Sequence, residues 1–366
     1  MKERGFAIRR FEASDKTGIV ELFRKVFGEN ASEKWWEWKY LSNPAGFHGG
    51  EGDIWIAEDR AGKIIGHWGV ITQKMKLGSQ TAIVAQAVDA VTDANYQGQG
   101  IFRSLVTNVC SEAKKRYSFI FGFPNELYKG YEKLGWQSRR LTEFLNFINY
   151  ELPLRSYFKN ETVAVFGKVA LKTLRMWGIL ATSFRFRKPT GDEVEIAEVE
   201  DFPIQIEEFW KKARSEYAVI LERDQTFLNW RFSERFGAYR KFIAKSIKTG
   251  ETTGYIVTKK TAIRGINDVL DIVDVHSLPD EDKSFANLVR SAVAMARNEG
   301  INVMHSRVPL WHKYSSFLRK LGFVPVGKAF EYVKLYQPRL IVYPLDQEKS
   351  IDTANWFYAM ADTDYA

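Results

Sequence analysis

Two glycines with a glutamine between them, Gly98 and Gly100, stand directly before an apolar segment of helical periodicity. The first backbone N–H groups of a helix have no intrahelical partner, and the helix dipole adds partial positive charge there. Glycine has no Cβ, so an anion can approach these groups closely. The stretch VTDANYQGQGIFRSL, residues 91–105, therefore predicts a phosphate or pyrophosphate site. From the two glycines alone, an ordinary turn before a helix would be the preferred interpretation, so the surrounding elements decide.

Other phosphate-binding loops fit this stretch poorly. A dinucleotide-binding fingerprint requires a third glycine where Arg103 stands, and a P-loop requires a Gly-Lys-Ser/Thr sequence that is absent.

The elements around the loop predict a strand before it and a helix after it. A short helix is expected near residues 16–27, and turn signals at EDRAGK and KLGSQ divide residues 53–91 into an antiparallel meander. Apolar residues recur every three or four positions from Ile101 to about Arg116, and YSFIFGFPN, residues 117–125, reads as a further strand. The loop therefore lies between a strand and a helix that returns to the sheet.

Composition narrows the class of protein. The 366 residues are too many for one ordinary core and suggest two domains, and no apolar run reaches the roughly 20 residues of a membrane span. The first residues lack the apolar region of a secretory signal, so we expect a cytoplasmic protein. Cys110 is the only cysteine and the five histidines show no paired ligand spacing, so neither a disulfide nor a metal is expected. The net charge of +8 is spread along the chain, which favours an anionic ligand over nucleic acid.

The loop resembles the acetyl-CoA loop of the GNAT (GCN5-related) N-acetyltransferases, which is usually written Gln/Arg-x-x-Gly-x-Gly/Ala and follows a strand. Here the loop runs from Gln97 to Phe102, and Phe102 stands where the family has a small residue. The resemblance implies an α/β (α+β) fold and acetyl-CoA as co-substrate. The residues that it implies for binding acetyl-CoA are Val91, through its backbone, Gln97, Gly98, Gln99, Gly100, Ile101, Phe102, Arg103 and Asn125.

A second signature resembles the family's Asn followed by Tyr-x-Lys-x-Gly-aromatic. The stretch FPNELYKGYEKLGW supplies Asn125, Tyr131, Lys133, Gly135 and Trp136, although the spacing from the asparagine to the tyrosine is one residue short of the commonest pattern. Acetyl transfer from a thioester to an amine requires a neutral nucleophile, a polarised carbonyl and a proton for the leaving thiolate. A tyrosine can supply that proton, and Tyr131 is the predicted general acid, with Tyr128 as the alternative.

The general base is predicted at Asp89, on the strand before the loop. His67, on a neighbouring segment, is the alternative. A relay through water, or a reaction without a base, also stays open.

The second half of the chain repeats the order of the first. Trp230-Arg231-Phe232 repeats Trp38-Lys39-Tyr40, and TTGYIVTKK, VLDIVDVHSL, a helix over about 282–298, INVMHSRVP and WHKYSSFLRKLGF follow in the order of their counterparts. His312 and Leu318 stand at the places of Asn125 and Tyr131. The stretch LPDEDKSFAN has no glycine and brings three acids, which repel a phosphate. The second copy is therefore predicted to bind no acetyl-CoA.

Between the copies, a largely apolar segment carries Lys168, Lys172 and Arg175 on one helical face. Three interpretations stay open: a connecting helix between domains, a helix on a membrane surface, or a partner interface.

We therefore expect two tandem GNAT-like domains, each with a mixed, mainly antiparallel sheet flanked by helices. The expected boundaries are 1–150 for the acetyl-CoA domain, 151–192 for the linker, 193–340 for the degenerate domain and 341–366 for a C-terminal tail. The expected activity is acetyl transfer from acetyl-CoA to a primary amine of a small molecule or peptide. The alternatives are an acyl-CoA-binding regulatory protein without turnover and an aminoacyl-tRNA-dependent peptidyltransferase.

Overall fold

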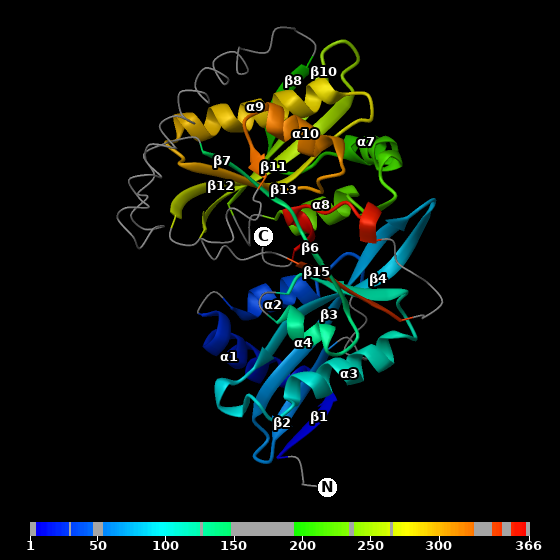
Figure 1. The fold of residues 1–366 in the computed structure, drawn as a ribbon, viewed down its shortest axis with the longest axis vertical. Helices are drawn as coiled ribbons and strands as arrows, with labels where there is room; N and C mark the ends of the chain where they lie inside the picture. Colours follow the sequence, from blue (N-terminus) through cyan, green and yellow to red (C-terminus); the bar gives the residue numbers. More distant parts are fainter. Residues whose placement is uncertain are drawn as a thin grey trace. The chain divides into compact units, whose positions relative to one another are not determined.

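The chain forms two compact units (Figure 1). A computed structural model describes residues 5–28, 31–46, 54–124, 127–147, 194–233, 238–263, 266–325, 339–345 and 353–363. Unit 1 comprises Met1–Arg140, Val219–Glu222 and Pro338–Asn355, and unit 2 comprises Leu141–Ala218, Arg223–Gln337 and Trp356–Ala366.

Unit 1 is a mixed sheet with helices on both faces. In chain order its first elements are β1 (Phe6–Arg10), η1 (Ala13–Asp15), α1 (Lys16–Phe27), α2 (Glu33–Tyr40), β2 (Ile54–Asp59), β3 (Ile64–Leu77), β4 (Gln80–Thr92), η2 (Ala94–Tyr96), α3 (Ile101–Ala113), β5 (Phe119–Gly122), α4 (Tyr128–Glu132) and β6 (Gln137–Arg140). The strand order is β1-β2-β3-β4-β5-β15-β6, and the pair β4–β5 is parallel whereas the other neighbours are antiparallel. The predicted meander and the helix predicted over 16–27 are confirmed.

Helix α3 forms because its apolar residues recur on one face. Six of its side chains are buried against the sheet: Ile101, Leu105, Val106, Val109, Cys110 and Ala113. This is the stripe that the sequence pattern predicts. Cys110 is 6% exposed, and burial raises the pKa of its thiol to about 12, so it is a buried hydrophobic residue rather than a reactive thiol.

Two strands of unit 1 come from the second half of the chain. Strand β9 (Val219–Leu221) pairs with β3, and β15 (Arg339–Pro344) lies between β5 and β6. The units therefore differ from the expected boundaries, which assign β9 to the degenerate domain and most of β15 to a tail. A strand pattern predicts that a strand exists, but its pairing partner depends on contacts far away in sequence.

Unit 2 has a second mixed sheet with the strand order β14-β7-β13-β12-β11-β10-β8. The elements are β7 (Glu143–Phe147), β8 (Val194–Val199), α7 (Gln205–Ala213), η3 (Arg214–Glu216), α8 (Gln225–Arg231), β10 (Tyr239–Ser246), β11 (Thr252–Ile263), β12 (Ile266–Ser277), α9 (Asp282–Asn298), β13 (Val303–Arg307), α10 (Lys313–Lys320) and β14 (Val324–Pro325), and the 3-10 turns η6 (Thr353–Asn355), assigned to unit 1, and η7 (Met360–Asp362) follow. Again one pair, β12–β13, is parallel and a helix connects its strands. The predicted repeat of element order is confirmed for these segments, including the helix over 282–298.

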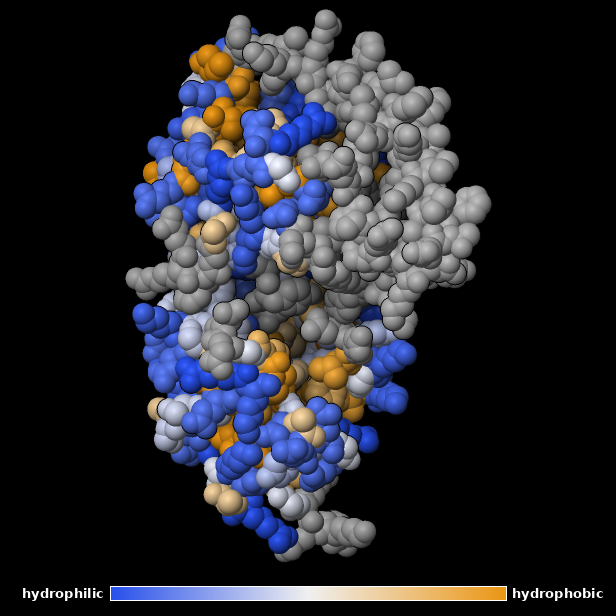
Figure 2. Space-filling model, turned by 90° about the vertical axis from the view of Figure 1, so that its left-hand side faces the viewer, coloured by the Kyte–Doolittle hydropathy of each residue, from blue (hydrophilic) through white to orange (hydrophobic). Residues whose placement is uncertain are grey.

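The segment with Lys168, Lys172 and Arg175 lies outside the described residues. Among the helices that are described, none combines the length and apolar character needed to cross a bilayer. Figure 2 shows a largely hydrophilic face with separate hydrophobic patches.

Candidate active site

The parallel pair of unit 1 separates before its longer strand ends. Strand β4 pairs with β5 from Ala85 to Ala87, opposite Ile120 to Gly122, but β4 continues to Thr92. Beyond Ala87, β4 has no strand partner on this side within the described residues. A strand edge of this kind presents backbone N–H and C=O groups that an extended ligand can bind.

A bulge interrupts β4 in this separated segment. The register between β3 and β4 shifts between His67 and Gly69, which pair with Val91 and Val88. Asp89 lies inside this shift with φ of 51°, a left-handed conformation that non-glycine residues rarely adopt. A strained residue of this kind persists only where its surroundings hold it.

The carboxylate of Asp89 is held at both oxygens by α2. Nζ of Lys39 lies 2.9 Å from Oδ1, and the hydroxyl of Tyr40 donates to Oδ2 at 2.8 Å. All three side chains are buried, and the Lys39 ammonium also lies 3.9 Å from the ring centroid of Trp35. Both carboxylate oxygens are therefore already engaged by neighbouring side chains. This geometry favours an anchoring role for Asp89 over the predicted role as general base.

The other base candidate, His67, contacts the backbone of the same bulge. Its Nδ1 lies 2.8 Å from the carbonyl oxygen of Asp89. Burial lowers the pKa of His67 to about 4, an effect opposed by the bond to Asp89 and assisted by the charge of Lys39, so the ring is neutral at physiological pH.

The predicted phosphate loop is open and exposed. Gly98 and Gly100 have φ of 77° and 83°, and no atom lies within 4 Å of the position that a Cβ would take at either residue. Gly100 is the N-cap of α3, and the first helical bond runs from the N–H of Ser104 to its carbonyl. The N–H groups of residues 101–103 therefore precede the helical pattern, as a phosphate cradle requires.

The other residues predicted at the loop divide between surface and interior. Gln97, Gln99 and Arg103 are exposed, Ile101 and Val91 are buried, and Phe102 is half-buried. The Phe102 ring packs edge-on against Tyr131, with 5.0 Å between centroids. Asn125 lies outside the described residues.

The predicted general acid is tied to β3 through its hydroxyl. The indole Nε1 of Trp68 donates to the hydroxyl oxygen of Tyr131 at 2.7 Å. An indole N–H is a donor only, so the hydroxyl proton of Tyr131 is directed elsewhere. The alternative, Tyr128, is half-buried, and its ring lies 4.0 Å from the guanidinium of Arg339.

Sequence reasoning missed Trp68, which belongs to the stretch GHWG on β3. Consecutive residues of a strand point to opposite faces, so His67 faces Phe23 of α1 whereas Trp68 faces Trp136 and Tyr131. The signal in the sequence was an aromatic residue directly after His67, the alternative base.

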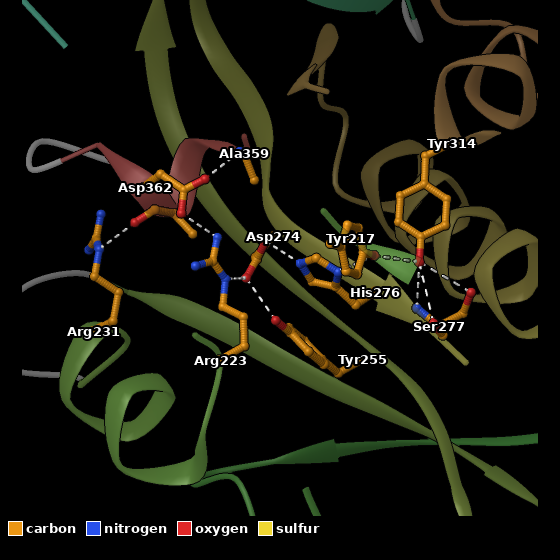
Figure 3. A network of polar contacts seen from close by, with 11 residues as sticks. Tyr217, Arg223, Arg231, Tyr255, Asp274, His276, Ser277, Tyr314, Ala359 and Asp362 are labelled. Carbon is orange, nitrogen blue, oxygen red and sulfur yellow. Dashed lines mark hydrogen bonds and ion pairs between the residues drawn. The ribbon is translucent and has the colours of Figure 1, made fainter. Parts of the chain in front are cut away.

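Unit 2 has an aspartate at the matching place of its parallel pair, and neighbouring side chains also hold its carboxylate. Asp89 and Asp274 each stand two residues beyond the last residue paired with the parallel neighbour, Ala87 in β4 and Ile272 in β12. Asp274 accepts from Arg223 Nε at 2.8 Å and from the Tyr255 hydroxyl at 2.8 Å (Figure 3). The same device therefore occurs where the glycine loop is absent, which supports anchoring rather than acyl chemistry.

Aromatic side chains fill the region of unit 2 beside β12. The ring of Phe357, from the last segment of the chain, lies 4.8 Å from the centroids of both Tyr217 and His312. The hydroxyl of Tyr314 accepts from the N–H of Ser277 at 2.8 Å (Figure 3). All five residues are buried. His312, at the predicted place of Asn125, is therefore a packed residue of this cluster.

Within the described ranges, no cluster of three or more His, Cys, Asp or Glu side chains could hold a metal ion.

A parallel pair that separates, with a glycine loop and a helix between its strands, is the arrangement of the GNAT fold, and the two sheets define a tandem GNAT-like α/β protein. Residues 7–139 match the family model described as Acetyltransferase (GNAT) domain. No curated protein matches the chain in sequence.

Solved structures share the fold over both units. A probable N-acyltransferase from Enterococcus faecalis V583 matches with a TM-score of 0.65 and 10% identity, over 93% of this chain and 72% of that chain. A GCN5-related N-acetyltransferase from Anabaena variabilis matches with a TM-score of 0.63 and 11% identity, over 93% of this chain and 73% of that chain. N-myristoyltransferase from Saccharomyces cerevisiae, solved with bound myristoyl-CoA, matches with a TM-score of 0.57 and 10% identity, over 94% of this chain and 80% of that chain.

Proposed function

We propose that this protein is an acyl-CoA-dependent N-acyltransferase that moves an acetyl group from acetyl-CoA to a primary amine. The observation that carries the proposal is the open loop of Gly98 and Gly100. This loop lies between β4, the strand that separates from β5, and the start of α3. The match of residues 7–139 to an acetyltransferase domain supports it.

In this proposal the loop binds the pyrophosphate of the co-substrate. The N–H groups that precede the first helical bond of α3 and the absence of Cβ atoms at Gly98 and Gly100 suit an anion, and each charge-assisted bond is worth about 1.5–3 kcal/mol. The backbone of β4 around Val91, beyond its last pair with β5, would hold the amides of the pantetheine arm. Asn125, which comes after β5 in the sequence and lies outside the described residues, is proposed to assist.

Acetyl-CoA supplies the thioester whose carbonyl carbon the amine lone pair attacks. A C–N bond forms, the C–S bond breaks, and Tyr131 gives its hydroxyl proton to the departing sulfur. The bond from Trp68 Nε1 orients the Tyr131 oxygen for this step. The carboxylate of Asp89 is engaged with Lys39 and Tyr40, so the amine loses its own proton to water. Water also returns a proton to Tyr131.

We further propose that the reaction takes place in the cytoplasm and that the acceptor is a small-molecule or peptide amine. A single, buried cysteine is compatible with a reducing compartment.

Thiol release from acetyl-CoA in the presence of a panel of primary amines and peptides tests the proposal. Amine-dependent release, with the acetylated product identified by mass spectrometry, is the expected result. Binding of acetyl-CoA by calorimetry without release under any amine would favour a regulatory binding protein. Release of amino acid from aminoacyl-tRNA, with no binding of acetyl-CoA, would favour a peptidyltransferase.

A further inference from the structure

We propose that His67 is a positioning residue for acyl transfer, because its Nδ1–H donates to the carbonyl of Asp89 and holds the bulge of β4. The inference rests on the proposed function. His67 acts through the backbone of β4 and does not touch the reacting atoms, so it is distinct from the general base considered for this position.

The direction of the bond follows from its acceptor. A carbonyl oxygen only accepts, so the nitrogen that lies 2.8 Å from it carries the hydrogen. His67 is then the neutral Nδ1–H tautomer, which agrees with its buried position and with the nearby Lys39 ammonium. Two side chains of α2, Lys39 and Tyr40, bind the carboxylate of Asp89 at the bulge.

The second ring nitrogen of His67 indicates which contribution of the histidine matters at this position. Nε2 is buried and has no hydrogen-bond partner among the described residues. The ring stands edge-on to Phe23, at 4.8 Å between centroids, and near Tyr40 at 6.1 Å. A buried polar atom without a partner destabilises the folded state, and a phenylalanine would avoid this cost. The bond from Nδ1 is therefore the contribution that an apolar residue cannot replace.

The geometry also separates this role from proton transfer. With Nδ1 directed to β4, Nε2 lies across the ring and points largely away from that strand. The separated edge of β4, where an acyl arm would bind, lies beyond the strand on the side of β5. A lone pair directed away from β4 does not reach an amine bound at that edge.

The bulge needs several contacts to persist. A residue other than glycine is strained in the left-handed conformation that Asp89 adopts. Lys39 and Tyr40 hold the carboxylate of Asp89, and His67 holds its carbonyl. Loss of the carbonyl contact leaves the side chain anchored but frees the peptide unit between Asp89 and Ala90 to rotate. That rotation would turn the backbone N–H groups of the separated segment away from a bound thioester.

Three variants of His67 separate the possible roles. His67→Asn places an amide N–H near the position of Nδ1, His67→Gln places one near Nε2, and His67→Phe keeps a ring without a donor. For each variant, acetyl-CoA-dependent thiol release with the best amine of the panel gives kcat and KM, calorimetry gives the Kd for CoA, and thermal unfolding reports the fold.

We expect His67→Phe and His67→Gln to lower kcat by about 10- to 100-fold while the Kd for CoA stays within about threefold. His67→Asn should keep kcat within about fivefold of the unsubstituted enzyme. The kcat profile from pH 6 to 8 should keep its shape in His67→Asn, because a neutral positioning group does not titrate there.

Equal losses of kcat in His67→Asn and His67→Phe would overturn the inference, and so would unchanged kcat in His67→Phe. A wider loss in which kcat, CoA affinity and unfolding temperature fall together in all three variants would show a merely structural residue. An unsubstituted protein that binds CoA but releases no thiol would overturn the proposed function and this inference with it. An active enzyme with indifferent His67 variants would overturn the inference alone.

Discussion

The indole N–H of Trp68 donates to the hydroxyl oxygen of Tyr131 at 2.7 Å, and both side chains are buried. The bond links β3, beside the bulge of β4, to α4. Because the tryptophan can only donate, it fixes the tyrosine oxygen without using the tyrosine proton. The contact therefore fixes the proposed proton donor, Tyr131, against β3.

Tyr131→Phe is expected to lower kcat by about 100-fold or more while the Kd for acetyl-CoA changes little. The substitution removes the proton donor and keeps the ring that packs on Phe102 and Trp136. Steady-state thiol release and calorimetry measure the two quantities. It also leaves the N–H of Trp68 without this acceptor, so thermal unfolding must show that the variant is folded.

Tyr128→Phe is the matched control, because Tyr128 is the neighbouring tyrosine of α4 and its ring lies beside Arg339. Its kcat should stay near that of the unsubstituted enzyme. The reverse result, with Tyr128→Phe inactive and Tyr131→Phe active, would assign the acid role to Tyr128.

Gly98→Asp is expected to weaken acetyl-CoA binding by about 100-fold or more. The added carboxylate lies beside the N–H groups at the start of α3, so it occupies the positive end of the helix and repels a pyrophosphate. A side chain at φ of 77° also costs about 1 kcal/mol. Calorimetric titration with acetyl-CoA measures the change.

Gly78→Asp controls for backbone strain. Gly78 has φ of 59° and lies in the turn between β3 and β4, and no atom lies within 4 Å of the position that its Cβ would take, as at Gly98. Both variants should lose similar stability, and only Gly98→Asp should lose binding. Equal acetyl-CoA affinity in the two variants would refute a phosphate site at the loop.

The local elements of both units could be predicted from the sequence because each depends on nearby residues. The helix over 16–27 and the stripe from Ile101 to Ala113 follow from apolar spacing, and the turn before α3 follows from Gly98 and Gly100. The placement of β15 could not be predicted in this way, because its partners Phe119–Gly122 and Gln137–Arg140 lie some 200 residues away.

The role of the predicted base, Asp89, also depends on contacts that the sequence does not reveal. An aspartate on the strand before the loop has the right chemistry for a base, so the sequence favours Asp89. The contacts with Lys39 and Tyr40, 50 and 49 residues away, make it an anchor in the structure. A residue type gives the chemistry that is available, but long-range contacts decide whether it is used.

His305 in unit 2 predicts a stability that depends on pH. Its ring nitrogens lie 3.0 Å from Asp271 Oδ1 and 3.2 Å from Glu143 Oε1. Burial opposes the charged ring, but the bonds to the two carboxylates outweigh burial and raise the pKa of His305 to about 9. The protonated ring therefore stabilises the folded state fully below its unfolded pKa of about 6.5, and the contribution is lost as the pH rises through 9.

The expected loss between pH 6.5 and pH 9.5 is roughly 1–3 kcal/mol in the free energy of unfolding of unit 2. Calorimetric unfolding at both pH values measures it, with His305→Gln as the control that removes the titrating group. The variant should be less stable at pH 6.5 and should lose less on going to pH 9.5. The same pH dependence in both proteins would show that His305 is not protonated in the folded state.

One molecule of acetyl-CoA per chain is expected, bound by unit 1. In unit 2 the region beside β12 is filled by Phe357, Tyr217 and His312, and the segment before α9 carries Asp280, Glu281 and Asp282 in place of glycines. Packed rings oppose the entry of a pantetheine arm, and the acids repel phosphate. Calorimetry should give a stoichiometry near one, and Gly98→Asp should weaken that binding by about 100-fold or more. A stoichiometry of two that falls to one in Gly98→Asp would reveal a second site in unit 2.

A fragment that ends near Asn149 is expected to be inactive and unstable, because its sheet is incomplete. Strand β15 lies between β5 and β6 and hydrogen-bonds to both, so a chain without Arg339–Pro344 leaves two strands of unit 1 without their shared neighbour. Strand β9 is also lost from the edge of β3, and β7 would lack β13. Exposed strand edges of this kind promote aggregation. Expression of residues 1–149 alone should give insoluble protein without acetyl-CoA binding, whereas co-expression with residues 150–366 should recover a soluble complex that binds acetyl-CoA. A soluble fragment with full binding would show that unit 1 does not need the strand from the second half of the chain.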